Sequence, residues 1–185
     1  MTTLDRAAAA ARTDQVTAAD FERIAGPHYP PLVRRLTLVL GDTADAEDVA
    51  QETYLAAYRA WDRFDGVDVR GWLYTIGLRL AFNRLRGRRR LLAAIRRVEP
   101  APVPGPADPD LWAALAMLDP RVRSALLLSS VDGYTQAEIG RILGAPEGTI
   151  ASWISRGRAS LRAALGNDER PDHDPGRHRR VGPTG

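Results

Sequence analysis

Apolar residues recur at intervals of three and four along most of the chain, which is the spacing of one face of an α-helix. This spacing predicts helices within residues 20–41, 42–64, 72–90, 111–118 and 120–132, and two further short helices within 135–162. Gly26-Pro27 and Pro30-Pro31 interrupt the first helix, and we expect a break or kink there because proline lacks the amide proton that a helix interior uses. No stretch carries a strand signal, so the pattern predicts an all-α fold.

The last two predicted helices, within residues 135–162, are joined by a tight turn. Gly144 ends the first of them because glycine adopts the left-handed conformation of a helix C-cap without strain. Pro146 suits the start of the second helix, and the Thr149 hydroxyl can accept a hydrogen bond from a first-turn amide. The second helix turns an apolar stripe inward, formed by Ile150, Ile154, Gly157 and Leu161. The spacing therefore predicts a helix-turn-helix.

The outward face of this second helix combines hydroxyls with guanidinium groups. Its members are Ser152, Ser155, Arg156, Ala159 and Arg162, with Arg158 at the margin. Small polar residues allow close approach to base edges in the DNA major groove, and the arginines behind them neutralise phosphates. The alternative is an ordinary helical hairpin with a solvated basic face.

A polar arc runs along the predicted helix within residues 72–90, whose first half is apolar on nearly every other side. The arc consists of Thr75, Arg79, Asn83, Arg86 and Arg90, at intervals of three or four. From Arg84 to Arg97 the chain has seven arginines and no acid. A surface helix normally intersperses acids with its bases, so the arc favours a nucleic-acid face over one that only keeps the protein soluble.

Between Asp42 and Glu52 the chain has five acids and no base. Acids in a first turn favour the helix dipole, and we expect Asp45 to be the N-cap. Asp48, Gln51 and Glu52 are spaced at i, i+3 and i+4, however, so they share one face. Capping needs only the first acids, which leaves this trio as a surface directed at a basic partner.

The chain divides at a proline-rich segment, EPAPVPGPADP at 99–109, which indicates a semi-rigid linker. Residues 19–98 and 110–166 then form two small helical domains, the second being the helix-turn-helix. Residues 1–18 lack an apolar stripe and residues 167–185 have almost no apolar side chains, so we expect a disordered arm and a disordered tail.

Composition excludes several classes of protein. The 185 residues include no cysteine, and the histidines, His28, His173 and His178, are too scattered for a metal site. No phosphate-binding glycine loop, zinc helix motif or nucleophile elbow is present, so we expect neither an enzyme nor a bound cofactor. No apolar run is long enough to span a membrane and no signal peptide is present, which predicts a cytoplasmic protein without membrane insertion.

The formal net charge is only +3, yet all 26 basic residues are arginine. Arginine suits bidentate contacts to phosphate and guanine, although an arginine-only inventory equally fits a GC-rich genome.

Three segments, in this order, resemble the extracytoplasmic-function (ECF) sigma factors of bacterial RNA polymerase, which belong to the sigma-70 superfamily. They are DAEDVAQETYLAAYRAW at 45–61, RGWLYTIGLRLAFNRLRGRRR at 70–90 and the segment 118–162 that ends in the helix-turn-helix. The resemblance covers about residues 21–165 and implies two all-helical domains on a flexible linker. Residues 19–98 correspond to sigma domain 2, which binds core polymerase and the promoter minus-10 element, and 110–166 to sigma domain 4, which binds the minus-35 element.

The resemblance also implies roles for single residues. Asp48, Gln51 and Glu52 match the family's acidic DxxQE helix, which docks on the clamp coiled coil of the polymerase β′ subunit. The loop at 64–70 corresponds to the one that captures an extruded minus-10 base. The minus-10 contacts it implies are Phe64, Asp65, Val69, Arg70, Trp72, Arg79, Asn83, Arg86 and Arg90, and the minus-35 contacts are Thr149, Ser152, Ser155, Arg156, Arg158 and Arg162.

The implied partners are the polymerase core, through the β′ clamp and the β flap, promoter DNA and an anti-sigma factor. Ala151, Trp153 and Ser155 depart from the residues usual in the family, so the minus-35 sequence that the family reads cannot be assigned to this chain. Leu80 and Asn83 also depart from the usual residues, which leaves the preferred minus-10 sequence open. The expected function is promoter-specific initiation of transcription. The alternative is a stand-alone helix-turn-helix regulator, which needs neither the acidic face nor the base-capturing loop.

Overall fold

The computed structural model describes residues 18–95 and 109–166, and every regular element in these two ranges is a helix. Residues 18–25 are helical and lead through a 3₁₀ turn, Gly26–His28, into the first half of the molecule. That half contains α2 (Tyr29–Leu40), α3 (Thr43–Arg59) and α4 (Val69–Ile95), and the second half contains α5 (Pro109–Ala116), α6 (Pro120–Ser130), α7 (Gln136–Leu143) and α8 (Glu147–Leu165). The predicted all-α fold is confirmed.

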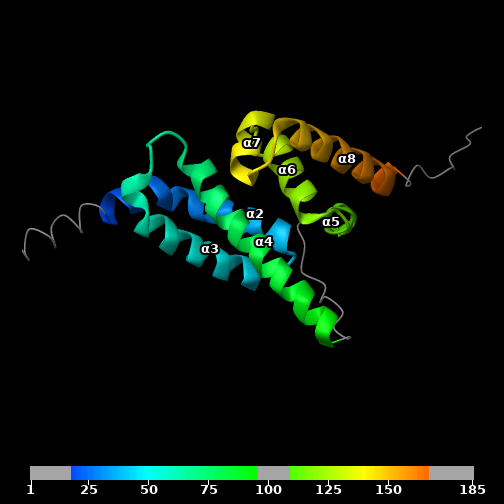
Figure 1. Cartoon of the computed structure of the whole chain (residues 1–185), viewed down its shortest axis with the longest axis horizontal. Coiled ribbons are helices and arrows are strands. Elements are labelled where there is room, and N and C mark those ends of the chain that lie inside the picture. Colours follow the sequence, from blue (N-terminus) through cyan, green and yellow to red (C-terminus); the bar gives the residue numbers. More distant parts are fainter. Residues whose placement is uncertain (1–17, 96–108, 167–185) are drawn as a thin grey trace, which may run out of the picture.

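Helices α2, α3 and α4 pack on one another, and the second half lies against one side of α2 and α4 (Figure 1). The break predicted at Gly26-Pro27 is present as the 3₁₀ turn. Pro30 and Pro31 do not interrupt α2, because they occupy its first turn, where no amide proton is needed. Gly41 then ends α2 in the left-handed conformation, with φ 75°.

The N-cap of α3 is Asp42 and not Asp45, so that prediction is wrong. The Asp42 side chain accepts a hydrogen bond from the Asp45 amide at 2.8 Å, which makes Asp45 a first-turn acid. The end of α2 sets the start of α3. Because α2 already ends at Gly41, Asp42 is free to take the extended conformation of an N-cap, with φ −150° and ψ 128°.

Helix α4 begins earlier than the apolar pattern indicates. Asp68 accepts a hydrogen bond from the Gly71 amide at 2.9 Å and so satisfies a first-turn donor. Val69 and Arg70 consequently lie in the first turn of α4, and the loop that precedes it is only 64–68. Gly66, at φ 79°, makes the turn within this loop.

The helix-turn-helix is confirmed as α7, a turn at Gly144 and α8. Thr135 and Glu138 form a reciprocal capping box at the start of α7, and Gly144 ends it at φ 64°. Pro146 is the N-cap of α8, which has no side-chain cap hydrogen bond. The capping role expected of Thr149 is therefore wrong, and its hydroxyl is not committed to an amide at the helix start.

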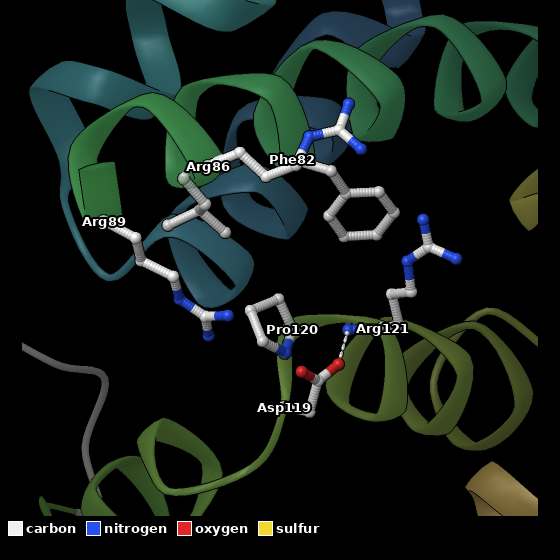
Figure 2. A pocket seen from close by; sticks show the side chains of 7 residues that line it. Phe82, Arg86, Arg89, Asp119, Pro120 and Arg121 are labelled. Carbon is white, nitrogen blue, oxygen red and sulfur yellow. Dashed lines mark hydrogen bonds between the residues drawn. The ribbon is translucent and has the colours of Figure 1, made fainter.

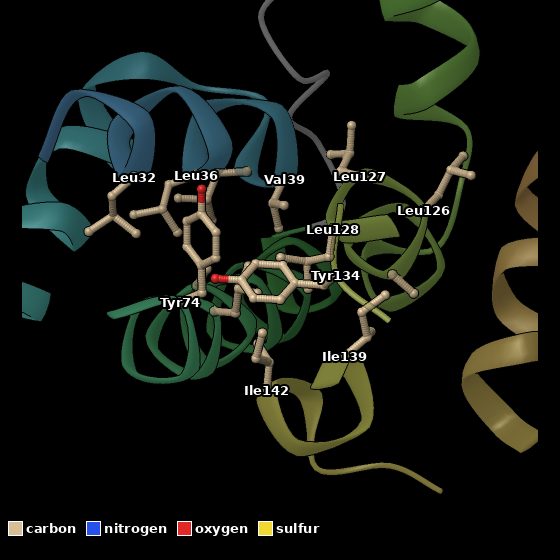
Figure 3. Packing of buried hydrophobic residues seen from close by; sticks show 14 of the residues in the cluster. Leu32, Leu36, Val39, Tyr74, Leu126, Leu127, Leu128, Tyr134, Ile139 and Ile142 are labelled. Atoms are coloured by element: carbon tan, nitrogen blue, oxygen red, sulfur yellow. The ribbon is translucent and has the colours of Figure 1, made fainter. Parts of the chain in front are cut away.

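One cluster of buried side chains runs through both halves of the molecule (Figure 3). It joins Leu32, Leu36 and Val39 of α2, Tyr74 and Leu78 of α4, Leu126, Leu127 and Leu128 of α6, Ile139 and Ile142 of α7, and Ile150 and Ile154 of α8. Figure 3 shows the rings of Tyr74 and Tyr134 meeting between the two halves, with their centroids 6.3 Å apart. The halves are thus packed together and not merely tethered.

The expected arm, linker and tail fall outside the described residues, except for Ala18 in the first helix and Pro109 at the start of α5.

Candidate nucleic-acid interface

Helix α8 presents Ser152, Ser155 and Arg156 on an exposed face, as the sequence predicts. Two glycines fix the position of this helix. A Cβ on Gly140 would lie 2.8 Å from the Ala145 carbonyl oxygen, and one on Gly157 would lie 3.2 Å from side-chain atoms of α6. Such close approaches leave the helix little freedom, so its polar face is held in a fixed direction.

Arg158 and Arg162 are exposed as well, and Arg162 lies about two turns after Ser155, on the same side of the helix. Both also line a mainly apolar groove between α5, α6 and α8, together with Leu111, Leu115 and Leu161 among others. The six residues predicted for the minus-35 element therefore all have exposed surface on α8, and two of the arginines reach the edge of this groove. Thr149, which is partly exposed, lies about one turn before Ser152 and nearly two turns before Ser155.

The loop at 64–68 is built around stacked aromatic rings. Phe64 stacks on Trp61 at 5.1 Å and on Trp72 at 5.1 Å, with interplanar angles of 21° and 29°. Phe64, Asp65 and Trp72 line one wall of a cleft, and Glu138 and Arg141 of α7 line the other. Val67, which is 83% exposed in this loop, was not predicted as a site residue. Its position directly after Gly66 was the only local sign that an apolar side chain would be exposed there.

The polar arc of α4 faces the second half of the molecule. Arg79, Asn83 and Arg86 line a cleft with Arg121 of α6 and Arg141 of α7, and an Arg86 N–H donates to the Asn83 side-chain oxygen. Figure 2 shows the neighbouring pocket, where Arg86 and Arg89 of α4 lie opposite Pro120 and Arg121.

This gathering of guanidinium groups from three helices, α4, α6 and α7, creates a strongly positive cleft, which suits phosphates. Arg121 and Arg141 could not be assigned to it from sequence, because they belong to the other half of the chain. Arg90, the last predicted member of the arc, is exposed on α4.

The acidic face of α3 is present as predicted, and it has an unexpected neighbour. Asp48 and Glu52 keep 61% and 57% of their side-chain surface exposed, and Gln51 is exposed beside them. Arg84 of α4 reaches Asp45 at 2.7 Å, Asp48 at 3.0 Å and Glu52 at 3.9 Å. Its hydrogen bonds to Asp45 and then to Asp48 raise the pKa of Arg84 against a smaller effect of burial. Arg84 thus belongs with the acids and not with the arc.

Arg70, predicted to contact the minus-10 element, is occupied by the second half of the chain. Its Nε donates to the Tyr134 hydroxyl at 3.0 Å, and Nη2 donates to the Asp132 carbonyl at 3.0 Å. The guanidinium also lies 4.7 Å from the centre of the Tyr134 ring. Burial raises the pKa of Tyr134 to about 12, partly offset by the hydrogen bond from Arg70.

Within residues 18–95 and 109–166, no three histidine or acidic side chains are grouped so that they could hold a metal ion. None of the helices in these ranges has the length and apolarity that crossing a membrane requires.

Comparison with known proteins gives the family. Residues 24–91 match the family described as Sigma-70 region 2, and residues 109–161 match Sigma-70, region 4. The ECF RNA polymerase sigma factor SigE of Mycolicibacterium smegmatis is 34% identical over 164 residues, which span 82% of this chain but only 64% of SigE. The RNA polymerase sigma factor CarQ of Myxococcus xanthus is 33% identical over 159 residues, spanning 80% of this chain and 91% of CarQ.

Among solved structures, the sigma factor RpoE of Bartonella quintana, in complex with the anti-sigma factor NepR, superposes with a TM-score of 0.69 at 28% identity. The match covers 80% of this chain and 98% of RpoE. The two family regions fall in the two halves described above, in the same order, and the chain belongs to the ECF sigma factors of the sigma-70 family.

Proposed function

We propose that this protein directs core RNA polymerase to specific promoters and helps to melt the minus-10 region. One observation carries the proposal: α3, α4 and α8 expose three chemically different surfaces, an acidic one, a basic one beside an aromatic loop, and a hydroxyl-rich one. A stand-alone helix-turn-helix regulator needs only the last of them. No catalytic step is assigned to the chain, since nucleotide addition belongs to the polymerase, and the protein acts in the cytoplasm with it.

The minus-10 element is assigned to the first half, residues 19–98. Taking a base out of the duplex stack costs a few kcal/mol, which the receiving pocket must offset. The stacked rings of Phe64 and Trp72, with Asp65 in the same cleft, offer an apolar surface with polar edges for that base. Val69 is half-buried and packs against the same apolar cluster as Trp72, so it supports this surface. Arg79, Asn83, Arg86 and Arg90 then hold the adjoining strand, mainly through phosphates. Arg70 joins them only when Tyr134 releases it.

The minus-35 element is assigned to the second half, residues 110–166. Ser152, Ser155, Arg156 and Thr149 occupy the first half of α8, where a recognition helix contacts base edges. Arg158 and Arg162 lie in the second half of α8, where they also line the groove beside α5 and α6, so we assign them phosphates at the margin of the site.

The polymerase core is assigned to the acidic face of Asp48, Gln51 and Glu52, docking on the β′ clamp coiled coil, with the β flap contacting the second half. The segment 99–109 joins the two DNA-binding halves as a linker. An anti-sigma factor is a candidate partner, since the similar RpoE is found in complex with one.

The test is transcription by core polymerase reconstituted with the full chain, followed by mapping of transcript 5′ ends on bacterial genomic DNA. We expect new start sites that share two sequence elements upstream, and their loss when Ser152, Ser155 and Arg156 are all changed to alanine. Start sites identical to those of core polymerase alone would contradict the proposal.

A further inference from the structure

We propose that Phe21, in the helix at 18–25, is a positioning residue for base capture: it holds the ring of Trp61, against which the aromatic side chains of the loop at 64–68 are stacked. The proposal rests on the function proposed above, in which this loop receives an extruded minus-10 base. It adds a residue that none of the contacts assigned above includes and that lies outside the residues 24–91 matching Sigma-70 region 2.

Three aromatic rings form the stack that offers the base its apolar surface. Trp61 and Trp72 each stack on Phe64 at 5.1 Å, and their own centroids are 6.0 Å apart, so each ring touches the other two. Phe64 and Trp72 line the cleft, whereas Trp61 does not. Trp61 therefore supports the other two rings from behind.

The backbone alone does not fix the ring of Trp61 firmly. Trp61 begins a single 3₁₀ turn, Trp61–Arg63, which directly precedes the loop. Such a turn has poorer hydrogen-bond geometry than an α-helix, and it is followed by extended backbone at Phe64, with φ −73° and ψ 128°. The orientation of the ring consequently depends on what its side chain packs against.

Phe21 provides that packing from the N-terminal helix. Its ring centroid lies 5.2 Å from that of Trp61, with the two planes at 88°, which is an edge-to-face arrangement. The same ring makes contacts of this kind with Tyr54 at 5.7 Å and Tyr58 at 5.4 Å, both on α3. Phe21 is only 6% exposed. Because edge-to-face contacts are directional, this one side chain fixes Trp61 relative to α3.

The helix at 18–25 is itself anchored to α3. The Tyr54 hydroxyl donates to the Ala25 carbonyl at 2.5 Å, at the end of the helix, where carbonyl groups lack partners within it. Ala25 is fully buried, and it lies four residues after Phe21, on the same face. Phe21 is therefore held against Trp61 by a bond independent of its own ring contacts.

Phe21 belongs to a small cluster of buried side chains that is separate from the cluster running through both halves. Its buried members are Phe21, Ala25, Ala57 and Leu73, and the side chains packed against them include Trp61, Val69 and Trp72. None of the four buried members is in the larger cluster. A change at Phe21 therefore acts on the support of the aromatic loop and leaves the packing of the larger cluster in place.

The experiment uses Phe21→Leu, which removes the ring but keeps a buried apolar side chain. Tyr29→Leu is the matched control, because Tyr29 makes the same kind of contact with Tyr54, at 5.0 Å and 82°, but its ring does not contact the stack. Both variants are compared with the parent chain at a temperature at which circular dichroism shows all three to be folded.

The first measurement needs only the free chain. 5-Fluorotryptophan replaces the four tryptophans, and the ¹⁹F resonances of Trp61 and Trp72 are assigned by changing each residue to phenylalanine. Loss of the Phe21 ring frees Trp61, so we expect Phe21→Leu to shift or broaden both resonances, including that of Trp72, whose ring Phe21 does not contact. Tyr29→Leu should leave both resonances unchanged.

The second measurement is a double-mutant cycle between protein and DNA. Holoenzyme binds a mapped promoter that is unpaired throughout the minus-10 element, either intact or with one base at a time replaced by an abasic site in the strand that is not transcribed. Loss of the captured base should weaken binding of the parent and of Tyr29→Leu by about fivefold or more, because the base no longer stacks on the rings. We expect this loss to be at least about threefold smaller for Phe21→Leu.

Unchanged resonances of Trp61 and Trp72 in Phe21→Leu overturn the proposal, and so does an abasic loss equal to that of the parent. If Phe21→Leu does not fold, Tyr54→Phe decides, because it removes the hydroxyl bound to Ala25 and keeps every ring. Changed resonances with a smaller abasic loss then support the proposal, and values equal to those of the parent overturn it.

Failure of the proposed function gives a different result. If no abasic site weakens binding of the parent holoenzyme, the capture of a base by this loop is wrong. The fluorine resonances of the free chain still decide whether Phe21 positions the aromatic stack.

Discussion

Arg156 and Arg86 carry the same charge on surfaces of different chemistry, so their replacement should have different consequences. Arg156 stands behind the serine pair of α8, and loss of a base contact there should weaken holoenzyme binding by about 1–3 kcal/mol for the preferred minus-35 sequence only. Arg86 lines the basic cleft, and Arg86→Ala should weaken binding to all promoters alike. It should also reduce the magnitude of the log-log salt slope by roughly 0.7 to 0.9.

The measurement is holoenzyme binding over a salt series on promoters varied within the minus-35 element. An equal loss on every promoter for Arg156→Ala would show that Arg156 reads no base. A change in sequence preference for Arg86→Ala, without a change of salt slope, would show that α4 reads bases at this position.

The burial of Tyr134 against Arg70 makes the stability of the fold depend on pH in the alkaline range. Its pKa is raised to about 12, mainly by burial, from the ordinary value near 10. Because the folded pKa is the higher one, the neutral phenol stabilises the fold fully below pH 10, and this stabilisation is lost as pH rises from 10 to about 12. Titration of phenolate absorbance should show a component near pH 12 that Tyr134→Phe removes and Tyr58→Phe leaves in place. Persistence of that component in Tyr134→Phe would refute the assignment.

At the scale of the element, the helix-turn-helix depends on one close approach. A methyl group at Gly140 would meet the backbone carbonyl of Ala145 at 2.8 Å, and backbone cannot move aside as a flexible side chain does. Gly140→Ala should therefore destabilise the protein by about 1–3 kcal/mol in chemical denaturation. Gly87, inside α4, has no atom within 4 Å of an added Cβ, so Gly87→Ala should stabilise by about 0.5–1 kcal/mol. Similar effects of the two changes would mean that α7 and its turn are not tightly packed.

Helix α3 carries the face assigned to polymerase. Gln51→Ala with Glu52→Arg should weaken binding to core polymerase by about 2 kcal/mol or more, because repulsion replaces attraction at a charged interface. The helical fold should survive, since Glu52 makes only the longest of the three Arg84 contacts, at 3.9 Å. Asp20→Arg makes the same change of net charge on another helix and serves as the control. Equal affinity of both variants in a titration with core enzyme would remove α3 from the interface.

Most helices were predictable because each has its own apolar periodicity, and several have a glycine at the C-terminal end or a proline in the first turn. The errors lie where one element depends on another. Asp45 was mistaken for the cap because the end of α2 decides where α3 can begin, and the start of α4 was placed late because Asp68 caps it from within the loop.

The candidate site was predicted only in part, for the same reason. Exposure of Ser152, Asp48 and Arg86 follows from helical phase. The occupation of Arg70 by Tyr134, 64 residues later, follows from tertiary packing, and no local pattern carries it. Arg84 was grouped with its basic neighbours because its acidic partners are 36 and 39 residues away.

At the scale of the whole molecule, the shared cluster of buried residues makes a prediction about cleavage. A site-specific protease sequence placed within 99–108 should allow the linker to be cut, and we expect the two fragments to elute together in gel filtration. The hydrogen bond from Arg123 to the Leu38 carbonyl of α2, the ion pair between Arg35 and Asp132, and the apolar cluster hold them. Asp132→Asn should allow them to separate. Fragments of the parent chain that elute apart would show that the halves do not pack stably without a covalent link.

The contacts of Arg84 have a thermodynamic consequence. One guanidinium serves Asp45, Asp48 and Glu52, and the last two belong to the face assigned to polymerase. A basic partner that takes these two carboxylates competes with Arg84, which then keeps only its contacts with Asp45. Binding free energies are reciprocal, so the affinity of the acidic face for such a partner is lowered by whatever free energy the Arg84 contacts with Asp48 and Glu52 contribute to the fold. Arg84 is then an intramolecular competitor that tunes how tightly this face holds a cationic ligand.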